Sequence, residues 1–487
     1  MKRYLVQTFG CQMNVHDSRR IEEVLEAAGW QATDEAALAD LVLFNTCSVR
    51  EKAEHKLRSA VGWLRPLKDE RPDLVIAVAG CVAQQEGERL LRDIAHIDLV
   101  LGPDNIPELP ALVELIRDGS PPIARTVFDL ETPQFLHAHP RSDARRETGA
   151  FVTVMKGCDE RCSFCIVPTT RGPERYRPAD DIVAEIRALV SGDVSGVREV
   201  TLLGQTVNSW YEPTASNAML ALREKRQMDS HFPGLLRRIA AEVPQLLRLR
   251  YTSPHPRHVT DALVAAHAEL AVLPAHVHLP VQSGSDRLLK RMIRRYSREE
   301  YVTRARALQS ARAGLTLSTD IIVGFPGETE DDFLQTLSLI REVGFVAAFG
   351  FKYSPRPQTP ALALGDDVPE DVKDDRLARL FAVVETQQRA HLASLVGSRA
   401  SVLVEGPSRD GSGRYAGRSE RHEIVHVEAP AGVDPTGTLV SAEIISAFKH
   451  SLLGRMEGGV PIPLTPPRPQ QPPRVRLGVL GTEPSAS

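Results

Sequence analysis

The chain has 487 residues, of which 42% are hydrophobic and 25% are charged, and its formal net charge is -4. This length exceeds one ordinary domain, and the composition is that of a globular protein rather than a disordered one. A charge so close to neutral excludes a histone-like protein that coats nucleic acid indiscriminately, although it allows a local basic surface.

The first residues, MKRYLVQTFGCQMN, lack the apolar stretch and small-residue cleavage site of a secretory signal. No later run reaches the roughly 20 apolar residues that a membrane span needs. We therefore expect a cytoplasmic protein without membrane contact, acting as a monomer. Thiols stay reduced in that compartment, so the six cysteines indicate metal binding or catalysis rather than disulfides.

Residues 1–118 alternate strand-like apolar runs with helical stretches. The apolar runs are residues 4–6, 41–44 and 74–78, and the helical stretches are residues 19–28 and 51–67. This alternation predicts an N-terminal parallel sheet with helices on its faces. Residues 119–143 are expected to form a linker, because the polar stretch HAHPRSDARRET begins within them.

Residues 144–391 contain a second series of strand candidates, separated by longer helical or loop stretches. The candidates are residues 151–155, 199–203, 247–252, 276–279, 317–323 and 347–351. The pattern predicts repeated βα units in a full or partial barrel. Residues 211–232 fit this rhythm poorly and are interpreted as an inserted loop.

Residues 394–457 carry short alternating strands (SVLVEG, EIVHVEA, LVSAEIISA) between Gly-rich turns, which predicts a small all-β barrel. Residues 459–487, with PIPLTPPRPQQPPR, are Pro-rich and expected to be disordered. The whole chain is therefore predicted to be an α/β protein with a β-barrel at its C-terminal end.

Cys158, Cys162 and Cys165 form a C-x3-C-x2-C cluster in KGCDERCSFC, directly after a predicted strand. Thiolates are the usual ligands of iron-sulfur clusters, and this close spacing lets one loop wrap one cluster. Three ligands leave a fourth iron open, whereas a structural zinc site is ordinarily closed by a fourth ligand. The alternatives are a zinc site that borrows a distant histidine, and three unconnected core thiols.

Cys11, Cys47 and Cys81 each follow a predicted strand, in YLVQTFGC, LVLFNTC and LVIAVAGC. The carboxyl ends of parallel strands line up along one edge of a sheet, so these three thiols are expected to meet there and hold a second cluster. Gly10 and Gly80 would permit tight turns beside them. Taken singly, each cysteine would be an ordinary buried thiol.

At these residues the chain resembles the methylthiotransferase family of radical S-adenosylmethionine enzymes, from about residue 3 to residue 457. The C-x3-C-x2-C cluster is the hallmark of the superfamily, and the three dispersed cysteines are that of the family. IIVGFPGET and HLPVQSGSD are similar to further family segments. The C-terminal barrel resembles a TRAM domain, although RSERHE replaces its usual Asn-rich stretch.

GCQMNVHDS and NTCSVREKAEHK are similar to the MiaB branch of that family, which acts on isopentenyl-modified adenosine next to the tRNA anticodon. The other branches, which act on threonylcarbamoyl-adenosine in tRNA or on an aspartate of a ribosomal protein, usually carry different residues there. They remain the alternative substrates. A non-catalytic iron-sulfur RNA-binding protein is the alternative from another class, and three rather than four thiolates at each site count against it.

The resemblance implies two 4Fe-4S clusters and S-adenosylmethionine in two roles. The cofactor would bind the open iron of the Cys158, Cys162 and Cys165 cluster and yield a 5′-deoxyadenosyl radical that removes hydrogen from the adenine. The cluster on Cys11, Cys47 and Cys81 would present the sulfur, to which a second S-adenosylmethionine first gives a methyl group. The implied partners are tRNA, an electron donor protein and a sulfur donor protein.

Several further residues are candidates for cofactor contact. Phe164 is placed to pack on the cofactor's adenine, although an aromatic residue in a loop is as often simple packing. Gly324, Pro326 and Gly327 could approach the same ligand, and an ordinary turn would look identical. Gln205 and Asn208 follow a predicted strand near the barrel mouth, where such enzymes place their sites.

Lysines and arginines in two segments are candidates for RNA contact, because RNA binding needs local positive charge. A charge run on a helix is more often only a solvated face. The candidates are Arg287, Lys290, Arg291, Arg294 and Arg295 in SDRLLKRMIRRYSR, and Arg414, Arg418, Arg421 and Lys449 in the C-terminal barrel.

Overall fold

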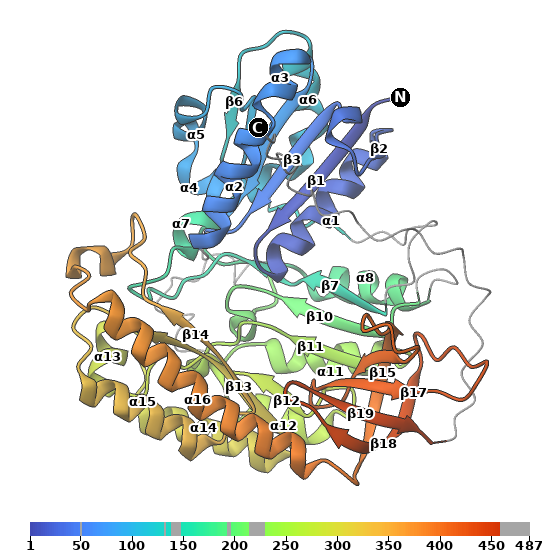
Figure 1. Ribbon diagram of the computed structural model, residues 1–487, viewed down its shortest axis with the longest axis vertical. Helices are drawn as coiled ribbons and strands as arrows, with labels where there is room; N and C mark the ends of the chain where they lie inside the picture. Colours follow the sequence, from blue (N-terminus) through green and yellow to red (C-terminus); the bar gives the residue numbers. More distant parts are fainter. Residues whose placement is uncertain (49–50, 131–132, 138–147, 192–195, 214–228, 458–487) are drawn as a thin grey trace, which may run out of the picture.

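The computed structural model describes residues 1–48, 51–130, 133–137, 148–191, 196–213 and 229–457. An N-terminal parallel sheet with its helices lies above a central α/β part, and a small β-barrel lies beside that central part (Figure 1). Most of the expected inserted loop, residues 131–132 and 138–143 of the expected linker, and nearly all of the Pro-rich C-terminal segment lie outside the described residues. No helix of the described ranges is both long and apolar enough to cross a membrane.

Six parallel strands form the N-terminal sheet in the order β2-β1-β3-β4-β5-β6. They are β1 (Arg3–Phe9), β2 (Gln31–Ala32), β3 (Leu41–Thr46), β4 (Val75–Gly80), β5 (Leu99–Leu101) and β6 (Ile123–Arg125). Every residue of β3 and β4 is buried, because helices cover both faces of the sheet. The predicted parallel sheet with helices on both faces is therefore confirmed.

The helices of this part are α1 (Gln12–Ala27), α2 (Glu51–Trp63), α3 (Arg65–Glu70), α4 (Cys81–Glu86), α5 (Glu88–Asp93) and α6 (Leu109–Arg117), with 3-10 turns η1 (Ala36–Leu38) and η2 (Pro103–Glu108). Leu25 of α1 and Leu112 of α6 pack on one face of the sheet, and Leu57 of α2 and Leu90 of α5 on the other.

Two boundaries differ from the sequence expectation. Helix α1 begins at Gln12, directly after Cys11, rather than at residue 19. Its first turns are polar, so an apolar helical pattern is visible only from the middle of the helix. Strand β6 lies inside the segment expected to be a linker, and it pairs with β5 as an edge strand of the sheet.

The central part contains two three-stranded parallel sheets, β11-β10-β7 and β12-β13-β14. The strands are β7 (Gly149–Thr153), β10 (Glu199–Leu203), β11 (Arg248–Tyr251), β12 (His276–His278), β13 (Thr316–Val323) and β14 (Ala347–Lys352). Within the described ranges no ladder joins the two sheets into a ring. Of the two architectures that the sequence allows, the structure therefore adopts the partial barrel.

Helices cover the outside of this partial barrel (Figure 1). They are α8 (Ala179–Ser191), α11 (Phe232–Glu242), α12 (Asp261–Glu269), α14 (Arg298–Ala311), α15 (Glu330–Val343) and α16 (Glu370–Ser394). The shorter elements near the carboxyl ends of the strands are β8 (Met155–Lys156), α7 (Val167–Arg171), β9 (Arg175–Tyr176), η3 (Val207–Ser209), η4 (Pro256–His258), α13 (Asp286–Arg291) and η5 (Pro360–Leu364).

The alternation along β13 separates the two faces of the second sheet. Leu317, Ile321 and Val323 are fully buried in the core that α14, α15 and α16 complete. Asp320 and Ile322 project to the other face and are only partly buried. The inner face of the partial barrel is therefore more polar and more exposed than the helix-covered face.

Five strands close the C-terminal barrel in the order β15-β16-β17-β19-β18, which confirms the predicted all-β barrel. They are β15 (Arg399–Pro407), β16 (Tyr415–Arg418), β17 (Ile424–Glu428), β18 (Leu439–Ala447) and β19 (Ser451–Met456). The guanidinium of Arg248 in β11 donates to the carbonyl oxygens of Ser401 and Arg418, both at 2.6 Å. This contact attaches the barrel to the central part.

Candidate active site with two groups of three cysteines

The register of the N-terminal sheet brings Cys11, Cys47 and Cys81 to one edge. Phe9 of β1 lies beside Thr46 of β3, and Thr46 lies beside Gly80 of β4. Each cysteine follows its strand end within two residues, and the backbone N–H of Cys47 donates to the carbonyl oxygen of Phe9 at 2.9 Å. The three thiols therefore gather where the sequence expectation placed them.

Glycines make this close approach of the strand ends possible. A Cβ at Gly80 would lie 2.3 Å from Oδ1 of Asn45 and 2.8 Å from the carbonyl oxygen of Thr46, and the residue has a φ of +92°. A Cβ at Gly10 would lie 2.7 Å from Cβ of Cys47. Larger residues at either position would push the cysteine-bearing turns apart.

Two buried asparagines hold α1 against β3 beside these thiols. Nδ2 of Asn14 donates to Oδ1 of Asn45 at 3.0 Å, and Nδ2 of Asn45 donates back to the carbonyl oxygen of Asn14 at 2.9 Å. The thiol of Cys11 donates to Oδ1 of Asn14 at 3.3 Å. These amide contacts fix the first turn of α1, and with it the position of Cys11.

The thiols of this group differ in their protonation. A side-chain hydrogen bond with Cys47 is the main cause that lowers the pKa of Cys11 to about 6. Burial raises the pKa of Cys81, although Arg171 opposes that effect by donating from Nε to Sγ of Cys81 at 3.3 Å. Three convergent thiols, one of them acidic and one beside a cation, fit the ligand set of a 4Fe-4S cluster.

Cys158, Cys162 and Cys165 lie on a tightly held loop after β8. Its first residue, Gly157, has a φ of +78°, and a Cβ there would lie 1.9 Å from the carbonyl oxygen of Pro173. The N–H of Cys158 donates to Gly172, and that of Cys165 to Cys162, at 3.1 and 3.0 Å. The backbone of the loop itself therefore helps to hold the three cysteines together.

Two side chains from other elements contact the sulfurs of this loop. The hydroxyl of Thr206 lies 2.9 Å from Sγ of Cys158, and the guanidinium of Arg294 donates to Sγ of Cys162 at 3.3 Å. Burial raises the pKa of Cys158, and it raises that of Cys165 to about 12. Such thiols become ligands when a metal supplies the missing positive charge, so this set also fits a cluster.

The structure removes Arg294 from the candidates for RNA contact. Its side chain is buried, and besides Cys162 it donates to the hydroxyl of Tyr296 and to the carbonyl oxygen of Pro280, both at 2.9 Å. The neighbouring Ile293 and Arg295 both have a φ of +57°, which is costly for side chains other than glycine. This strained turn directs Arg294 inward while Arg295 stays exposed.

The remaining cofactor candidates lie near the same loop. Phe164 packs on an apolar cluster that contains Met292 and Phe325. The N–H of Gly324 donates to the carboxylate of Glu328 at 2.6 Å.

The rest of the Gly-Phe-Pro-Gly turn is also held within the chain. The carbonyl oxygen of Pro326 accepts from Arg291 at 3.2 Å, and the N–H of Gly327 donates to Asp367 at 2.7 Å. These contacts hold the turn in place beside the apolar cluster on which Phe164 packs. Contact between this turn and the cofactor remains a prediction.

The two polar candidates at the end of β10 have different surroundings. Asn208 holds the backbone of His255, accepting from its N–H at 2.7 Å and donating to its carbonyl oxygen at 3.0 Å. Oε1 of Gln205 is buried and has no hydrogen-bond partner among the described residues. Gln205 therefore keeps an acceptor available for a ligand, whereas Asn208 has a structural task.

Sequence reasoning missed the polar group formed by Glu160, His255 and His258, whose ligand atoms lie within 4.8 Å of one another. This spacing would suit a cation, yet Nδ1 of His255 accepts from the N–H of Arg257 at 3.2 Å. Nε2 of His255 must then carry the proton and cannot bind a cation, and it has no hydrogen-bond partner among the described residues. Arg257 also lies 3.5 Å from Glu160, so the geometry favours a hydrogen-bond network over a metal site.

The two cysteine groups face one interface between the N-terminal and central parts. Asp104 of η2 accepts from Nζ of Lys156 at 3.0 Å and also pairs with Arg175. His16 of α1 lies 3.2 Å from the hydroxyl of Thr153. Buried polar contacts beside the cysteine groups thus join the N-terminal part to the central part.

Comparisons with known proteins agree with this arrangement. The model of Uncharacterized protein family UPF0004 matches residues 3–102, and that of the Radical SAM superfamily matches residues 152–340. The tRNA-2-methylthio-N(6)-dimethylallyladenosine synthase of Sorangium cellulosum is 61% identical over 464 residues, which cover 93% of both chains. This chain belongs to that synthase family.

Other members of the synthase family are similarly matched along nearly their whole length. Those of Acidithiobacillus ferrooxidans and Burkholderia cenocepacia are 43% and 44% identical and cover 93% of this chain and 97% of their own. Membership in the radical SAM superfamily implies one 4Fe-4S cluster and S-adenosylmethionine.

A solved structure supports the fold alone. The radical S-adenosylmethionine methyltransferase TsrM from Kitasatospora setae has a TM-score of 0.52 at 15% identity, over 84% of this chain and 82% of its own. The similarity extends over most of both chains, so it includes more than the central partial barrel.

Proposed function

We propose that this protein converts N6-isopentenyladenosine, next to the anticodon of a tRNA, to its 2-methylthio derivative. The observation that carries the proposal is the presence of two separate three-thiol groups, connected through Arg171, in a chain that is 61% identical to a synthase of that name. One group would serve hydrogen removal and the other sulfur transfer.

Cys158, Cys162 and Cys165 are proposed to hold the cluster that superfamily membership implies. When reduced, a 4Fe-4S cluster with bound S-adenosylmethionine supplies the 5′-deoxyadenosyl radical that such enzymes use. The protein's part would be to hold the cluster through three sulfurs of one loop, which would leave the fourth iron open for the cofactor. Thr206 and Arg294 contact two of the three sulfurs, so they help to set the potential of the site.

Cys11, Cys47 and Cys81 are proposed to hold a second 4Fe-4S cluster, which would supply the sulfur of the methylthio group. Their position at the open edge of the N-terminal sheet, above the central part, directs this group toward the same interface. We also propose that four residues near the cysteine loop of the central part contact the cofactor: Phe164, Gly324, Pro326 and Gly327.

The inner face of the partial barrel supplies a candidate surface for the adenine. Phe349 and Phe351 lie on β14 beside Asp320 and Ile322 of β13, and their side chains are 55% and 41% exposed. Aromatic side chains left exposed on a sheet face are suited to stacking with a nucleic-acid base.

A polar pair lies beside these aromatic rings. Nε2 of His278 in β12 lies 3.4 Å from a carboxylate oxygen of Asp320, and its ring meets that of Phe349 edge-on with centroids 5.8 Å apart. We therefore propose that Phe349 contacts the base face while the His278–Asp320 pair contacts a base edge by hydrogen bonding.

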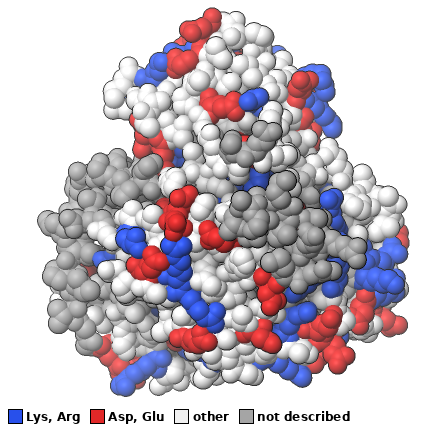
Figure 2. Space-filling model, turned by 180° about the vertical axis from the view of Figure 1, so that it is seen from behind, with Lys and Arg blue, Asp and Glu red and all other residues white. Residues whose placement is uncertain are grey.

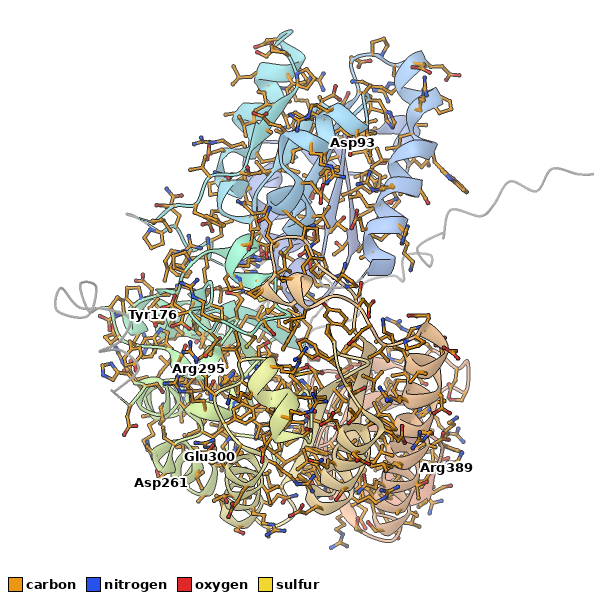
Figure 3. All side chains as sticks on the ribbon, turned by 90° about the vertical axis from the view of Figure 1, so that its left-hand side faces the viewer. Asp93, Tyr176, Asp261, Arg295, Glu300 and Arg389 are labelled. Atoms are coloured by element: carbon orange, nitrogen blue, oxygen red, sulfur yellow. The ribbon has the colours of Figure 1, made fainter. Side chains whose placement is uncertain are left out.

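Charge around the site favours local rather than broad contacts with tRNA. Lys and Arg are mixed with Asp and Glu over the described surface seen in Figure 2. Lys290 and Arg295 line a cavity of about 440 Å³ together with Asp286 and Ser297, and Arg295 lies on the outside of the central part (Figure 3). We propose that these two cations contact RNA phosphates.

Most other candidate cations already have partners. Arg287 pairs with Asp332, and in the C-terminal barrel Arg421 pairs with Glu420 and Glu423. Three further pairs join Arg414 to Glu428, Arg418 to Glu405, and Lys449 to Glu385. Barrel contacts with tRNA are proposed through such exposed pairs, in which exchange of a carboxylate for a phosphate costs little.

We further propose that separate proteins donate the electrons and the sulfur. The enzyme is proposed to be a monomer that acts on its tRNA in the cytoplasm. The test is mass spectrometry of tRNA nucleosides from cells that lack the gene, with and without a plasmid copy. We expect the 2-methylthio-isopentenyl nucleoside only with the intact copy, and isopentenyladenosine in its place with a Cys47→Ala copy. Restoration of a methylthio-threonylcarbamoyl nucleoside instead would assign the alternative substrate.

A further inference from the structure

Arg171 connects the two cysteine groups through one side chain. It is the last residue of α7, the helix that follows Cys165, and α7 packs on α4, whose first residue is Cys81. Its Nε donates to Sγ of Cys81 at 3.3 Å, and its terminal nitrogen donates to the carboxylate of Asp17 at 2.6 Å. A residue of the central part therefore forms part of the N-terminal site.

Burial makes this contact energetically demanding. The Arg171 side chain is only 7% exposed, and a buried guanidinium is tolerated only when it is paired and hydrogen-bonded. Asp17 supplies the counter-charge: burial raises the pKa of its carboxyl, yet the charge of Arg171 and the hydrogen bonds with His16 and Arg171 together outweigh this and lower it to about 2. The ion pair with Asp17 holds the guanidinium in place, which leaves Nε directed at sulfur.

The choice of sulfur as the second acceptor is informative. A neutral thiol is a weak acceptor, whereas a thiolate, free or bound to a metal, accepts a charge-assisted hydrogen bond readily. The fork of an arginine can serve Asp17 and Cys81 at the same time, and a lysine ammonium would lack that fixed geometry. The contact is therefore built for an anionic sulfur at Cys81.

We propose that Arg171 is a positioning residue of the N-terminal site, which fixes Cys81 and raises the reduction potential of the cluster there. The proposal rests on the proposed function, since it assumes the second cluster. A cationic donor at a ligand sulfur stabilises the reduced state, which carries one more electron than the oxidised state. The helix that directly follows the loop of Cys158, Cys162 and Cys165 thereby influences the other site.

The simpler interpretation is that Arg171 only joins the two parts of the molecule. Arg175 provides the matched control, because it is equally buried and crosses the same interface. Its contacts are the carboxylate of Asp104, the carbonyl oxygens of Asp129 and Arg171, and the ring of Phe128. Loss of Arg175 therefore weakens the interface without removing a donor from a cysteine.

The experiment uses full-length protein with Cys158, Cys162 and Cys165 replaced by Ala, reconstituted anaerobically with iron and sulfide. Redox titration followed by electron paramagnetic resonance gives the midpoint potential of the remaining cluster. We expect R171M to shift that potential to more negative values, R171K to shift it less, and R175M to leave it unchanged. Thermal unfolding of each variant, compared with R175M, measures the structural contribution separately.

The outcomes separate the two proposals. An unchanged potential in R171M, or equal shifts in R171M and R175M, overturns the role of Arg171 while leaving the second cluster in place. No iron in the triple-Ala protein that retains Arg171 overturns the second cluster and, with it, this inference. If R171M fails to retain iron while R175M retains it, the positioning of Cys81 is supported, and R171K then reports the potential.

Discussion

The two cysteine groups are built in opposite ways. Cys158, Cys162 and Cys165 are neighbours in sequence and lie on one loop whose own backbone hydrogen bonds shape it. Cys11, Cys47 and Cys81 come from three strand ends and meet only because β1, β3 and β4 pair in one register. A local site depends on its loop, whereas a dispersed site depends on the topology of a whole sheet.

The largest expected effect separates the tasks of the two groups. Cys162→Ala should lose both 5′-deoxyadenosine and the methylthio product, because the radical-generating site lacks a ligand. Cys47→Ala should still form 5′-deoxyadenosine under reducing conditions but yield no methylthio nucleoside. Liquid chromatography with mass spectrometry of both products, on tRNA that carries the isopentenyl group, measures this. Methylthio product from Cys47→Ala near the wild-type yield would remove the N-terminal group from sulfur transfer.

Glycine variants should break one group at a time. Gly80→Ala should abolish iron binding at the N-terminal site and lower the free energy of unfolding by about 3 kcal/mol, because the new Cβ meets Asn45 and Thr46. Gly157→Ala should cost the iron of the loop site instead, since its Cβ meets the carbonyl of Pro173. Iron analysis and denaturant unfolding are the measurements.

Gly29→Ala is the matched control for these variants. Its φ is +83°, and nothing lies within 4 Å of its added Cβ. We expect it to cost roughly 1 kcal/mol from the backbone conformation alone and to leave iron binding unchanged. Equal losses of iron in Gly29→Ala and Gly80→Ala would mean that close packing at Gly80 does not form the site.

The groups should also differ in their response to pH in metal-free protein. The hydrogen bond with Cys47 lowers the pKa of Cys11 to about 6, whereas burial raises that of Cys165 to about 12. At pH 7 iodoacetamide should therefore alkylate Cys11 much faster than Cys165, and alkylation of Cys11 should slow as the pH falls through 6. Peptide mass spectrometry gives the rate at each residue.

The same shift has a consequence for stability, with a definite sign. The folded-state pKa of Cys11 lies below the ordinary thiol value of 9, so ionisation favours folding. This contribution is complete above pH 9 and is lost as the pH falls toward 6. Metal-free wild-type protein should accordingly gain more stability than Cys11→Ser between pH 6 and 9. An identical pH dependence of the two proteins in urea unfolding would contradict it.

The smallest expected effect concerns tRNA affinity. Replacing Lys290 and Arg295 by Ala should weaken binding and reduce the slope of log affinity against log salt by about 1 for each phosphate that is no longer neutralised. Arg92→Ala is the control, because Arg92 is exposed on α5 of the N-terminal part and belongs to neither set of proposed RNA contacts. Filter binding at several salt concentrations distinguishes the variants.

Much of the fold could be predicted because apolar periodicity marks buried strands such as β3, β4 and β13. The start of α1 could not, because its first turns are polar and face the cysteine edge. The sequence could not decide between a partial and a full barrel either, because no local pattern shows whether β11 and β12 pair.

The candidate site shows the same limit. Both cysteine groups were foreseen, the loop group from its spacing and the dispersed group from its strand ends. Arg171 and Arg294 were not recognised as sulfur contacts, because a buried arginine and a solvated one look identical in sequence. Their tasks depend on which distant thiol the folded chain places beside them.

The register of the N-terminal sheet also decides when its thiols become neighbours. Cys11, Cys47 and Cys81 come together only after β1, β3 and β4 have paired, and parallel pairing between distant segments forms slowly. The loop of the central part holds its three thiols within eight residues of sequence. The proposed second cluster would therefore have to be inserted into a sheet that has already folded.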